Sequence, residues 1–242
     1  MYKGRKIAAI APAYNELGKI EKVAAGLAAL DFLDMPIVVD DGSTDGCGEA
    51  AEKAGAIVVR HEARRGLGAA IRSGIDHARS HGADIIVILA GNGKDDPAQI
   101  PRLLDPICDD DIDYVQGSRY LPGGEYGTMP RHRRFATWLH PRLVRLVTGF
   151  KGTDSTNGFR AYKASIFEDL EIDIWKDWLD GTELEFYLHV EVIRKKGRIA
   201  EVAVSKIYPQ RVGYKHYTKV KPFVDWWRIL KPLVYHALHI RR

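Results

Sequence analysis

The sequence predicts an α/β fold in which helices cover both faces of a mainly parallel sheet, followed by an amphipathic helical tail. Two patterns predict it. Short apolar runs alternate with segments of helical periodicity through the first half of the chain, which is typical of repeated strand–helix–strand units. Polar turns follow these apolar runs directly, and in a parallel sheet such turns lie at the edge where ligands bind. The 242 residues suffice for one large domain.

Each predicted strand is a short apolar run. The first half of the chain contains five, at residues 6–11, 36–39, 57–60, 84–89 and 114–117. The helices between them have apolar residues three and four positions apart, over residues 20–30, 68–80 and 97–107. Strands joined by such helices imply right-handed crossovers and parallel pairing.

The second half of the chain is less regular. Residues 117–134 are rich in Gly, Arg and Pro and predict a long loop of the kind that often carries function. Helical patterns follow over residues 135–148 and 181–196, and a strand pattern over 199–205. From Lys219 onward, apolar and aromatic residues recur at helical spacing and predict a final helix.

Cysteine usage and hydropathy indicate the cellular compartment in which the protein is expected. Cys47 and Cys108 are far apart and offer neither a disulfide framework nor the spacing of a metal site, so a reducing compartment is expected. The first residues are typical of a strand and a turn rather than a signal peptide. No run approaches the roughly 18 apolar residues of a membrane span. We therefore predict a cytoplasmic protein with access to the inner membrane face.

Charge divides the chain in two. Residues 205–242 carry nine Lys and Arg against one Asp, a net of +8, whereas the remainder carries 27 against 31, a net of −4. We assign residues 1–205 to the α/β domain and residues 206–242 to a basic, aromatic extension. Such an extension suits phosphates or an anionic lipid surface. A solvated surface and a contact with a second subunit of a homo-oligomer are the alternatives, and we expect no nucleic-acid partner.

Three polar turns come directly after predicted strands. They are residues 11–16 (APAYNE), 39–45 (VDDGSTD) and 64–68 (RRGLG), with Arg72 one helical turn beyond the third. After a single strand, acidic residues and glycines often do no more than make a turn. Three such turns in this order predict a binding site at one edge of the sheet.

The order of these turns resembles the family 2 glycosyltransferases with the GT-A fold, above all the branch of dolichyl-phosphate mannose synthases and related polyprenyl-phosphate glycosyltransferases. The resemblance runs from about residue 7 to about residue 213. It implies a nucleotide-diphospho-sugar donor whose nucleoside is held by the first two turns and whose close approach is permitted by the glycines of the third. The donor-binding residues that it implies are Pro12, Tyr14, Glu16, Asp40, Asp41, Gly66, Gly68, Arg72 and, after the fourth strand, Asn92.

The turn after the fourth strand departs from the family pattern. Family members place an Asp-x-Asp motif there that binds Mg²⁺ or Mn²⁺ on the diphosphate of the donor. This chain has Ala90 and Asn92 in the two positions, and Lys94 where a further metal ligand is often found. One interpretation is a weaker metal site rebuilt from Asn92 with Asp95 or Asp96. In another, the Lys94 ammonium group lies near the diphosphate and replaces part of the charge of the metal.

Two later segments resemble the acceptor side of the family site. Arg119 lies in a Gly-Ser-Arg turn. Asp154 and Arg160 lie in residues 154–162, which resemble the family segment Asp-x-x-Ser-Gly-Phe-Arg. The resemblance implies that these residues reach the sugar and the acceptor, with Arg119 and Arg160 near the acceptor phosphate. An ion pair between Asp154 and Arg160 that only holds the loop is the structural alternative.

Residues 208–215 resemble the family segment that meets the lipid phosphate. Arg211 and Lys215 are its predicted phosphate ligands, although the Ser of the family pattern is missing, which leaves Lys219 as an alternative to Lys215. With this segment, the residues predicted to act in catalysis are Asp154, Lys94 and Arg211.

The resemblance implies direct displacement with inversion at the anomeric carbon. Our leading hypothesis is transfer of a hexose-type sugar to a polyprenyl phosphate, which is largely ionised near neutral pH because its second pKa is about 6. A soluble or glycan hydroxyl acceptor would instead need a general base, for which Asp154 and Glu183 are the candidates.

Two other classes of protein are alternatives to this hypothesis. A nucleotidyltransferase would want a Gly-rich, Lys-containing loop in the first turn, where this chain has Pro12 and Tyr14. A degenerate nucleotide-sugar-binding subunit is suggested by Ala90 and Asn92. In the extension, Trp226 and Trp227 among basic residues suit a peripheral contact with a membrane surface.

Overall fold

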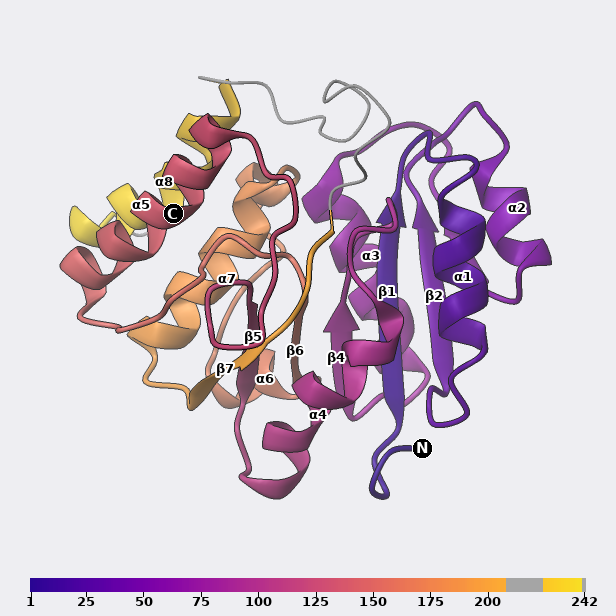
Figure 1. Ribbon diagram of the computed structural model, residues 1–242, viewed down its shortest axis with the longest axis horizontal. Coiled ribbons are helices and arrows are strands. Elements are labelled where there is room, and N and C mark those ends of the chain that lie inside the picture. Colours follow the sequence, from indigo (N-terminus) through magenta and orange to yellow (C-terminus); the bar gives the residue numbers. More distant parts are fainter. Residues whose placement is uncertain (208–223, 241–242) are drawn as a thin grey trace.

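A seven-stranded sheet forms the centre of the molecule (Figure 1). The computed structural model describes residues 1–207 and 224–240. The strands lie in the order β3-β2-β1-β4-β6-β5-β7, and neighbours are parallel except that β6 runs antiparallel to both β4 and β5. Their bounds are β1 Ile7–Ala13, β2 Met35–Asp40, β3 Ile57–Arg60, β4 Ile85–Ile88, β5 Tyr114–Ser118, β6 Arg160–Lys163 and β7 Ile199–Ala203. The predicted α/β class with a mainly parallel sheet is confirmed.

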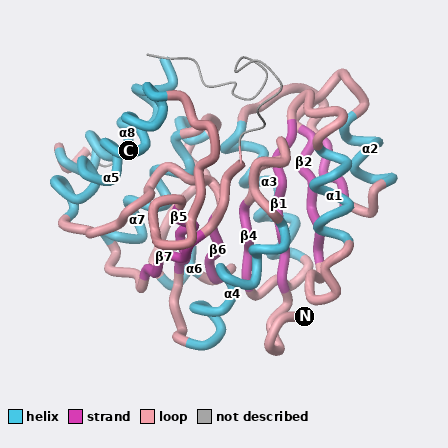
Figure 2. The backbone as a smooth tube through the Cα atoms, viewed as in Figure 1, coloured by secondary structure: helices cyan, strands magenta, loops and turns pink. Residues whose placement is uncertain are grey.

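Helices cover both faces of this sheet (Figure 2). Alternate residues of the central strands face opposite sides, so that Ile10 belongs to the core cluster that includes residues of α3, α6 and α7, while Ala9 belongs to the cluster that includes residues of α1, α2 and α4. The bounds of these helices are α1 Ile20–Ala28, α2 Cys47–Lys53, α3 Leu67–Ser80, α4 Ile100–Asp109, α6 Ile166–Asp169 and α7 Glu183–Arg194. Two short 3₁₀ turns, η1 Pro97–Gln99 and η2 Asp177–Leu179, precede α4 and α7.

The sequence pattern did not predict strand β6. Its four residues, RAYK, begin and end on a cation, so they form no apolar run. The strand forms because Ala161 and Tyr162 fit between β4 and β5, where both are fully buried. Long-range pairing therefore determines the strand conformation of this segment, and local propensity does not.

A lateral layer of three helices lies beside the sheet. The helices α5 (Arg131–Thr148) and α8 (Val224–Ala237) pack with α7 around Val144, Val190 and Leu233. The predicted helix of the extension is therefore present as α8. Within the two described ranges, no helix combines the length and apolar character needed to cross a bilayer.

Candidate functional site

The first two polar turns are joined by hydrogen bonds. Strands β1 and β2 are parallel neighbours, so the turns that follow them emerge at the same edge of the sheet. The Ser43 hydroxyl accepts a hydrogen bond from the Asn15 backbone N–H at 3.0 Å, and the Asn15 side-chain oxygen accepts one from the Thr44 N–H at 2.9 Å. Asn15 adopts a positive φ of 48°, a conformation that Asn tolerates better than most residues.

Asp41 joins the third turn to the second. Its Oδ1 accepts a hydrogen bond from the Arg65 N–H at 2.8 Å, and its Oδ2 accepts one from the Gly66 N–H at 2.8 Å. His61 Nδ1 lies 2.8 Å from Asp41 Oδ1. The structure therefore brings the three predicted turns together, with Asp41 directed toward the chain itself.

Tyr14, Glu16 and Asp40 lie where the three turns meet. The Arg64 guanidinium group, from the third turn, lies 4.3 Å from the centre of the Tyr14 ring. Glu16 is ion-paired with Lys19 at 2.6 Å. Asp40 is buried and accepts a hydrogen bond from the backbone of its own turn at 3.0 Å. An aromatic face and two carboxylates thus come from the first two turns.

The glycines of the third turn approach another part of the chain. The Gly68 N–H donates to the Asp180 carbonyl oxygen at 2.8 Å. A Cβ atom on Gly66 or Gly68 would collide with the backbone of residues 179–181. Arg72 donates to the carbonyl oxygens of Ile174 and Lys176 at 3.2 and 3.1 Å, and pairs with the Asp180 carboxylate. These three residues hold the segment before α7, a role different from the predicted contact with a donor.

The loop after β4 contains a buried ion pair. Lys206 Nζ lies 2.6 and 2.8 Å from the two carboxylate oxygens of Asp95, and 3.1 Å from Asn157 Oδ1. Both members of the pair are buried, and Asp95 also accepts a hydrogen bond from the Ala90 N–H at 2.9 Å. The first residues of the basic extension are therefore attached to the loop where the family places its metal motif.

Lys94 is buried beside this ion pair, with 5% of its surface exposed. Burial, together with the nearby cations Arg133 and Lys206, lowers the pKa of its ammonium group to about 7, while Asp95 and Glu16 act in the opposite direction. A Cβ atom on Gly91 would lie 2.6 Å from the Pro12 carbonyl oxygen, so the β4 loop adjoins the turn after β1. The predicted convergence of the early turns and Lys94 is thus seen in the fold.

The residues of the β4 loop do not fit a divalent metal ion, which prefers carboxylate oxygens. Ala90 offers no ligand, Asp95 is held in its ion pair, and Asp96 accepts a hydrogen bond at the start of η1. Asn92 Oδ1 is buried without a hydrogen-bond partner among the described residues, so one neutral oxygen is available. Across residues 1–207 and 224–240, no group of three His, Cys, Asp or Glu side chains could hold a metal ion. The interpretation of a metal site rebuilt with Asp95 or Asp96 has no support in this geometry.

Asp154 and Arg119 form a buried, bidentate ion pair at the end of β5. Arg119 Nε lies 2.7 Å from Asp154 Oδ2, and Nη2 lies 2.9 Å from Oδ1. Burial alone would raise the pKa of Asp154, but the charge and hydrogen bonds of Arg119 hold it below its usual range. Asp154 has no exposed surface, and Arg119 is 2% exposed.

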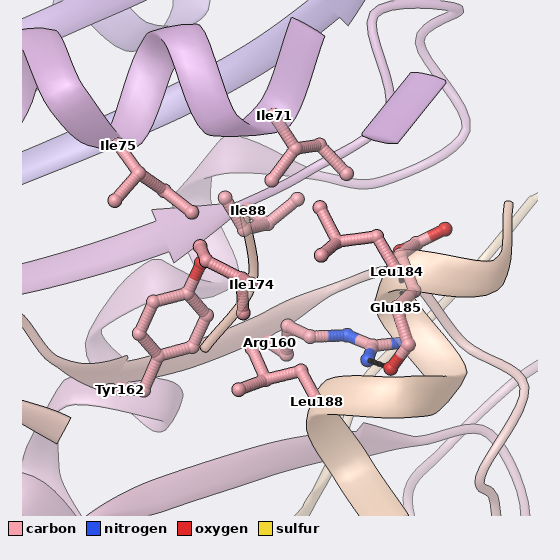
Figure 3. A pocket seen from close by; sticks show the side chains of 9 residues that line it. All are labelled: Ile71, Ile75, Ile88, Arg160, Tyr162, Ile174, Leu184, Glu185 and Leu188. Atoms are coloured by element: carbon pink, nitrogen blue, oxygen red, sulfur yellow. Dashed lines mark hydrogen bonds and ion pairs between the residues drawn. The ribbon is translucent and has the colours of Figure 1, made fainter. Parts of the chain in front are cut away.

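Arg160 also lies in the core (Figure 3). It donates to the carbonyl oxygens of Asn157 and Glu185 at 2.6 and 2.7 Å. A further bond joins it to the Tyr114 hydroxyl at 2.9 Å. In Figure 3 its guanidinium group lies beside the Glu185 side chain, among isoleucine and leucine side chains. The guanidinium groups of Arg119 and Arg160 are thus engaged by Asp154 and by backbone carbonyl oxygens, so these residues hold the loop before β6 and do not face an acceptor phosphate as predicted.

Three predicted residues, Arg211, Lys215 and Lys219, lie outside the described residues. Two contributors were missed by sequence reasoning. His61 follows a strand and resembles any loop histidine. Lys206 is 111 positions from Asp95, so no local pattern could pair them.

The chain is similar in sequence to known glycosyltransferases. The family model described as glycosyl transferase family 2 matches residues 8–171. An undecaprenyl-phosphate mannosyltransferase from Micrococcus luteus is 31% identical over 206 residues, which cover 83% of this chain and 83% of the relative. A dolichyl-phosphate hexose transferase from Haloferax volcanii is 30% identical over 235 residues, which cover 97% of this chain and 95% of the relative.

A solved structure with a similar fold is glucosyl-3-phosphoglycerate synthase from Mycobacterium tuberculosis, in complex with Mn²⁺, UDP and glucosyl-3-phosphoglycerate. The TM-score is 0.71, and the alignment covers 98% of this chain and 80% of that chain at 22% identity. At this level of identity the likeness establishes the fold alone.

Proposed function

The chain belongs to glycosyl transferase family 2, and from this premise we propose that it is an inverting hexosyltransferase that moves a sugar from a nucleotide-diphospho-sugar to a polyprenyl phosphate. Two relatives support the acceptor class. One, 31% identical, is named for undecaprenyl phosphate, and the other, 30% identical along almost the whole chain, is named for dolichyl phosphate.

The burial of Asp154 carries the choice of a phosphate acceptor over a hydroxyl acceptor. A hydroxyl nucleophile needs a general base within hydrogen-bond reach. Asp154 has no exposed surface and is bound by Arg119 through both oxygens, while the other candidate base, Glu183, faces Arg228 at 3.4 Å. A phosphate monoester carries its own negative charge at neutral pH and can attack without a base.

The convergent turns supply the donor side of the proposal. The Tyr14 face suits the base, and the Glu16 and Asp40 carboxylates suit the ribose hydroxyls, because charge-assisted hydrogen bonds are strong. Lys94 lies at the end of β4, where negative charge would grow on the diphosphate as it leaves. For the acceptor phosphate, the proposed ligands are Arg211 and Lys215.

We further propose that Lys94 supplies charge that a divalent cation supplies in metal-dependent members of the family. The donor set of the β4 loop supports this, because it offers one amide oxygen and a lysine in place of carboxylates. Turnover is expected to persist in excess EDTA and to gain less than about threefold from added Mn²⁺ or Mg²⁺. Complete loss of turnover in EDTA, with recovery on adding metal, would refute this part of the proposal.

Mass spectrometry of the products tests the acceptor. The full chain is incubated with a panel of UDP-, GDP- and dTDP-sugars and with either a polyprenyl phosphate or the matched polyprenol without phosphate. A glycosyl-phosphoprenol is expected, and no product from the polyprenol. Glycosylation of the polyprenol or of a soluble sugar would contradict the proposed acceptor. Donor binding without any transfer would favour a nucleotide-sugar-binding subunit.

A further inference from the structure

One face of α5 presents aromatic and basic side chains to solvent. We define the α5 outer face by six exposed residues spaced three, four or one apart, and therefore on one side of the helix: Arg131, Phe135, Trp138, Arg142, Arg145 and Leu146. Phe135, Trp138 and Leu146 are 60%, 45% and 82% exposed, which is unusual for such large apolar side chains on one helix. The opposite side of α5 carries the buried residues Thr137, His140 and Val144 and packs on the body of the molecule.

The charge of α5 has one sign. Its 18 residues include five arginines and neither Asp nor Glu. Arg131, Arg133 and Arg134 lie in the first turn, at the positive end of the helix dipole, where cations are unfavourable and carboxylates are normally found. The Arg134 guanidinium group lies 5.1 Å from the centre of the Tyr126 ring, whereas Arg131 belongs to the α5 outer face, where an anionic partner would offset the unfavourable position.

The aromatic and basic groups of this face are held together. The Arg142 guanidinium group lies 3.6 Å from the centre of the Trp138 ring, and the Phe135 and Trp138 rings stack at 5.9 Å between centroids. Aromatic rings among arginines are typical of surfaces that lie at a membrane interface, with the rings at headgroup depth and the cations near lipid phosphates.

The helix α8 is the neighbour of α5 and also carries exposed aromatic residues. It packs against α5, and the two lie side by side at the end of the molecule remote from α1 and α2 (Figure 1). Trp226 and Trp227 of α8 are 42% and 54% exposed. A second copy of the chain is a poor occupant, because a twofold contact through the α5 outer face would set arginines against arginines.

We propose that the α5 outer face docks on the anionic surface of a lipid bilayer. The docking proposal rests on the proposed function in one respect. A polyprenyl phosphate resides in a bilayer, and its phosphate is exposed at the headgroup level. The docking needs no spanning helix, since interfacial rings and arginines together give peripheral binding.

Sedimentation with vesicles tests the proposal. The full chain is mixed with vesicles of phosphatidylcholine alone or with one third phosphatidylglycerol. Binding is expected only with the anionic lipid, and we expect it to weaken with added salt. In the variant R131Q/R142Q/R145Q, binding should fall on the order of a hundredfold, because each cation near an anionic surface contributes roughly fivefold. In F135A/W138A it should fall at least tenfold.

The matched control removes three exposed cations elsewhere. The variant R5Q/K22Q/K53Q loses the same charge from the N-terminus, α1 and α2, and should bind vesicles within about threefold of the unmodified chain. Equal loss in both charge variants, or no loss in the α5 variant, would overturn the proposal.

A second readout separates this inference from the proposed function. Transfer to a short-chain, water-soluble prenyl phosphate should be the same in R131Q/R142Q/R145Q and in the unmodified chain, which also shows that the variant is folded. Absence of that transfer from the unmodified chain would contradict the proposed function, while the vesicle result would still decide the docking surface.

Discussion

Buried side chains determine the charge of the candidate site. Asp95, a possible metal ligand by sequence, forms an ion pair with Lys206. The Asp95 side chain is 0% exposed and the Lys206 side chain is 9% exposed. Lys94 lies next to this pair without belonging to it, and burial lowers the pKa of its ammonium group to about 7. The loop after β4 therefore has no carboxylate at the two positions of the family's metal motif, which are Ala90 and Asn92, and carries Lys94 beside them.

Removal of one partner of this ion pair should destabilise the fold. In Asp95→Asn, Lys206 would stay buried without its counter-charge, so the free energy of unfolding should fall by roughly 3–5 kcal/mol. The double variant D95N/K206M should recover a large part of that loss, because it buries no unpaired charge. Urea unfolding of the three proteins measures both effects, and a loss under about 1 kcal/mol in the single variant would contradict the importance assigned to the pair.

Replacement of Lys94 should weaken donor binding without destabilising the fold. In Lys94→Met, a nucleoside diphosphate should bind about 10- to 100-fold more weakly in the presence of EDTA, because a charge-assisted hydrogen bond contributes roughly 1.5–3 kcal/mol. The midpoint of thermal unfolding should stay the same or rise, since a buried cation is removed. Calorimetric titration beside the control K53M, a change on the exposed surface of α2, measures this. Unchanged affinity in K94M would count against the proposed role.

At the level of elements, α5 and α7 enclose two buried histidines. His140 of α5 packs on Phe186 of α7, and His189 of α7 packs between the rings of Tyr114 and Phe150 at 5.6 and 5.7 Å. Neither ring nitrogen of His189 has a hydrogen-bond partner among the described residues. Burial lowers the pKa of His140 to about 4 and that of His189 to about 3.

This interface should weaken in mild acid. Between about pH 6.5 and 3 the unfolded chain binds a proton at His189 and the folded chain does not, so the contribution to stability is complete above pH 6.5 and is lost as the pH falls. Since each pH unit in that window costs about 1.4 kcal/mol per histidine, His189→Phe should gain on the order of 2 kcal/mol on the unmodified chain between pH 7.5 and pH 5. Urea unfolding at the two pH values measures it. A difference that does not change with pH would show that His189 binds a proton equally well in the folded and the unfolded chain.

At the scale of the whole molecule, the first half of the fold could be predicted from its sequence because each strand there is an apolar run with a polar turn after it. The turns that hold Asn15, Ser43 and Asp41 follow from the same pattern, since parallel neighbours place their ends together. Apolar patterning alone does not indicate which ligand binds. The nucleotide-sugar donor was predicted from the resemblance of these turns to a known family.

What could not be predicted depends on contacts between distant segments. Strand β6 forms only because β4 and β5 leave a place between them. Gly68 is required by the approach of residues 179–181, more than a hundred positions away, although a glycine after a strand equally suits a ligand. The burial of Arg119 and Arg160 has the same origin, because a motif shows which residues are present and not which way they face.

The proposed function depends on one donor site formed by the turns after β1, β2 and β3 and the loop after β4. A crystal structure of the chain with the nucleoside diphosphate that most raises its melting temperature, grown in the presence of EDTA, tests this. We expect the base against Tyr14, the ribose between Glu16 and Asp40, and a diphosphate oxygen about 2.7–3.2 Å from Lys94 Nζ. A nucleotide bound on another surface, or one whose diphosphate lies away from Lys94, would contradict it.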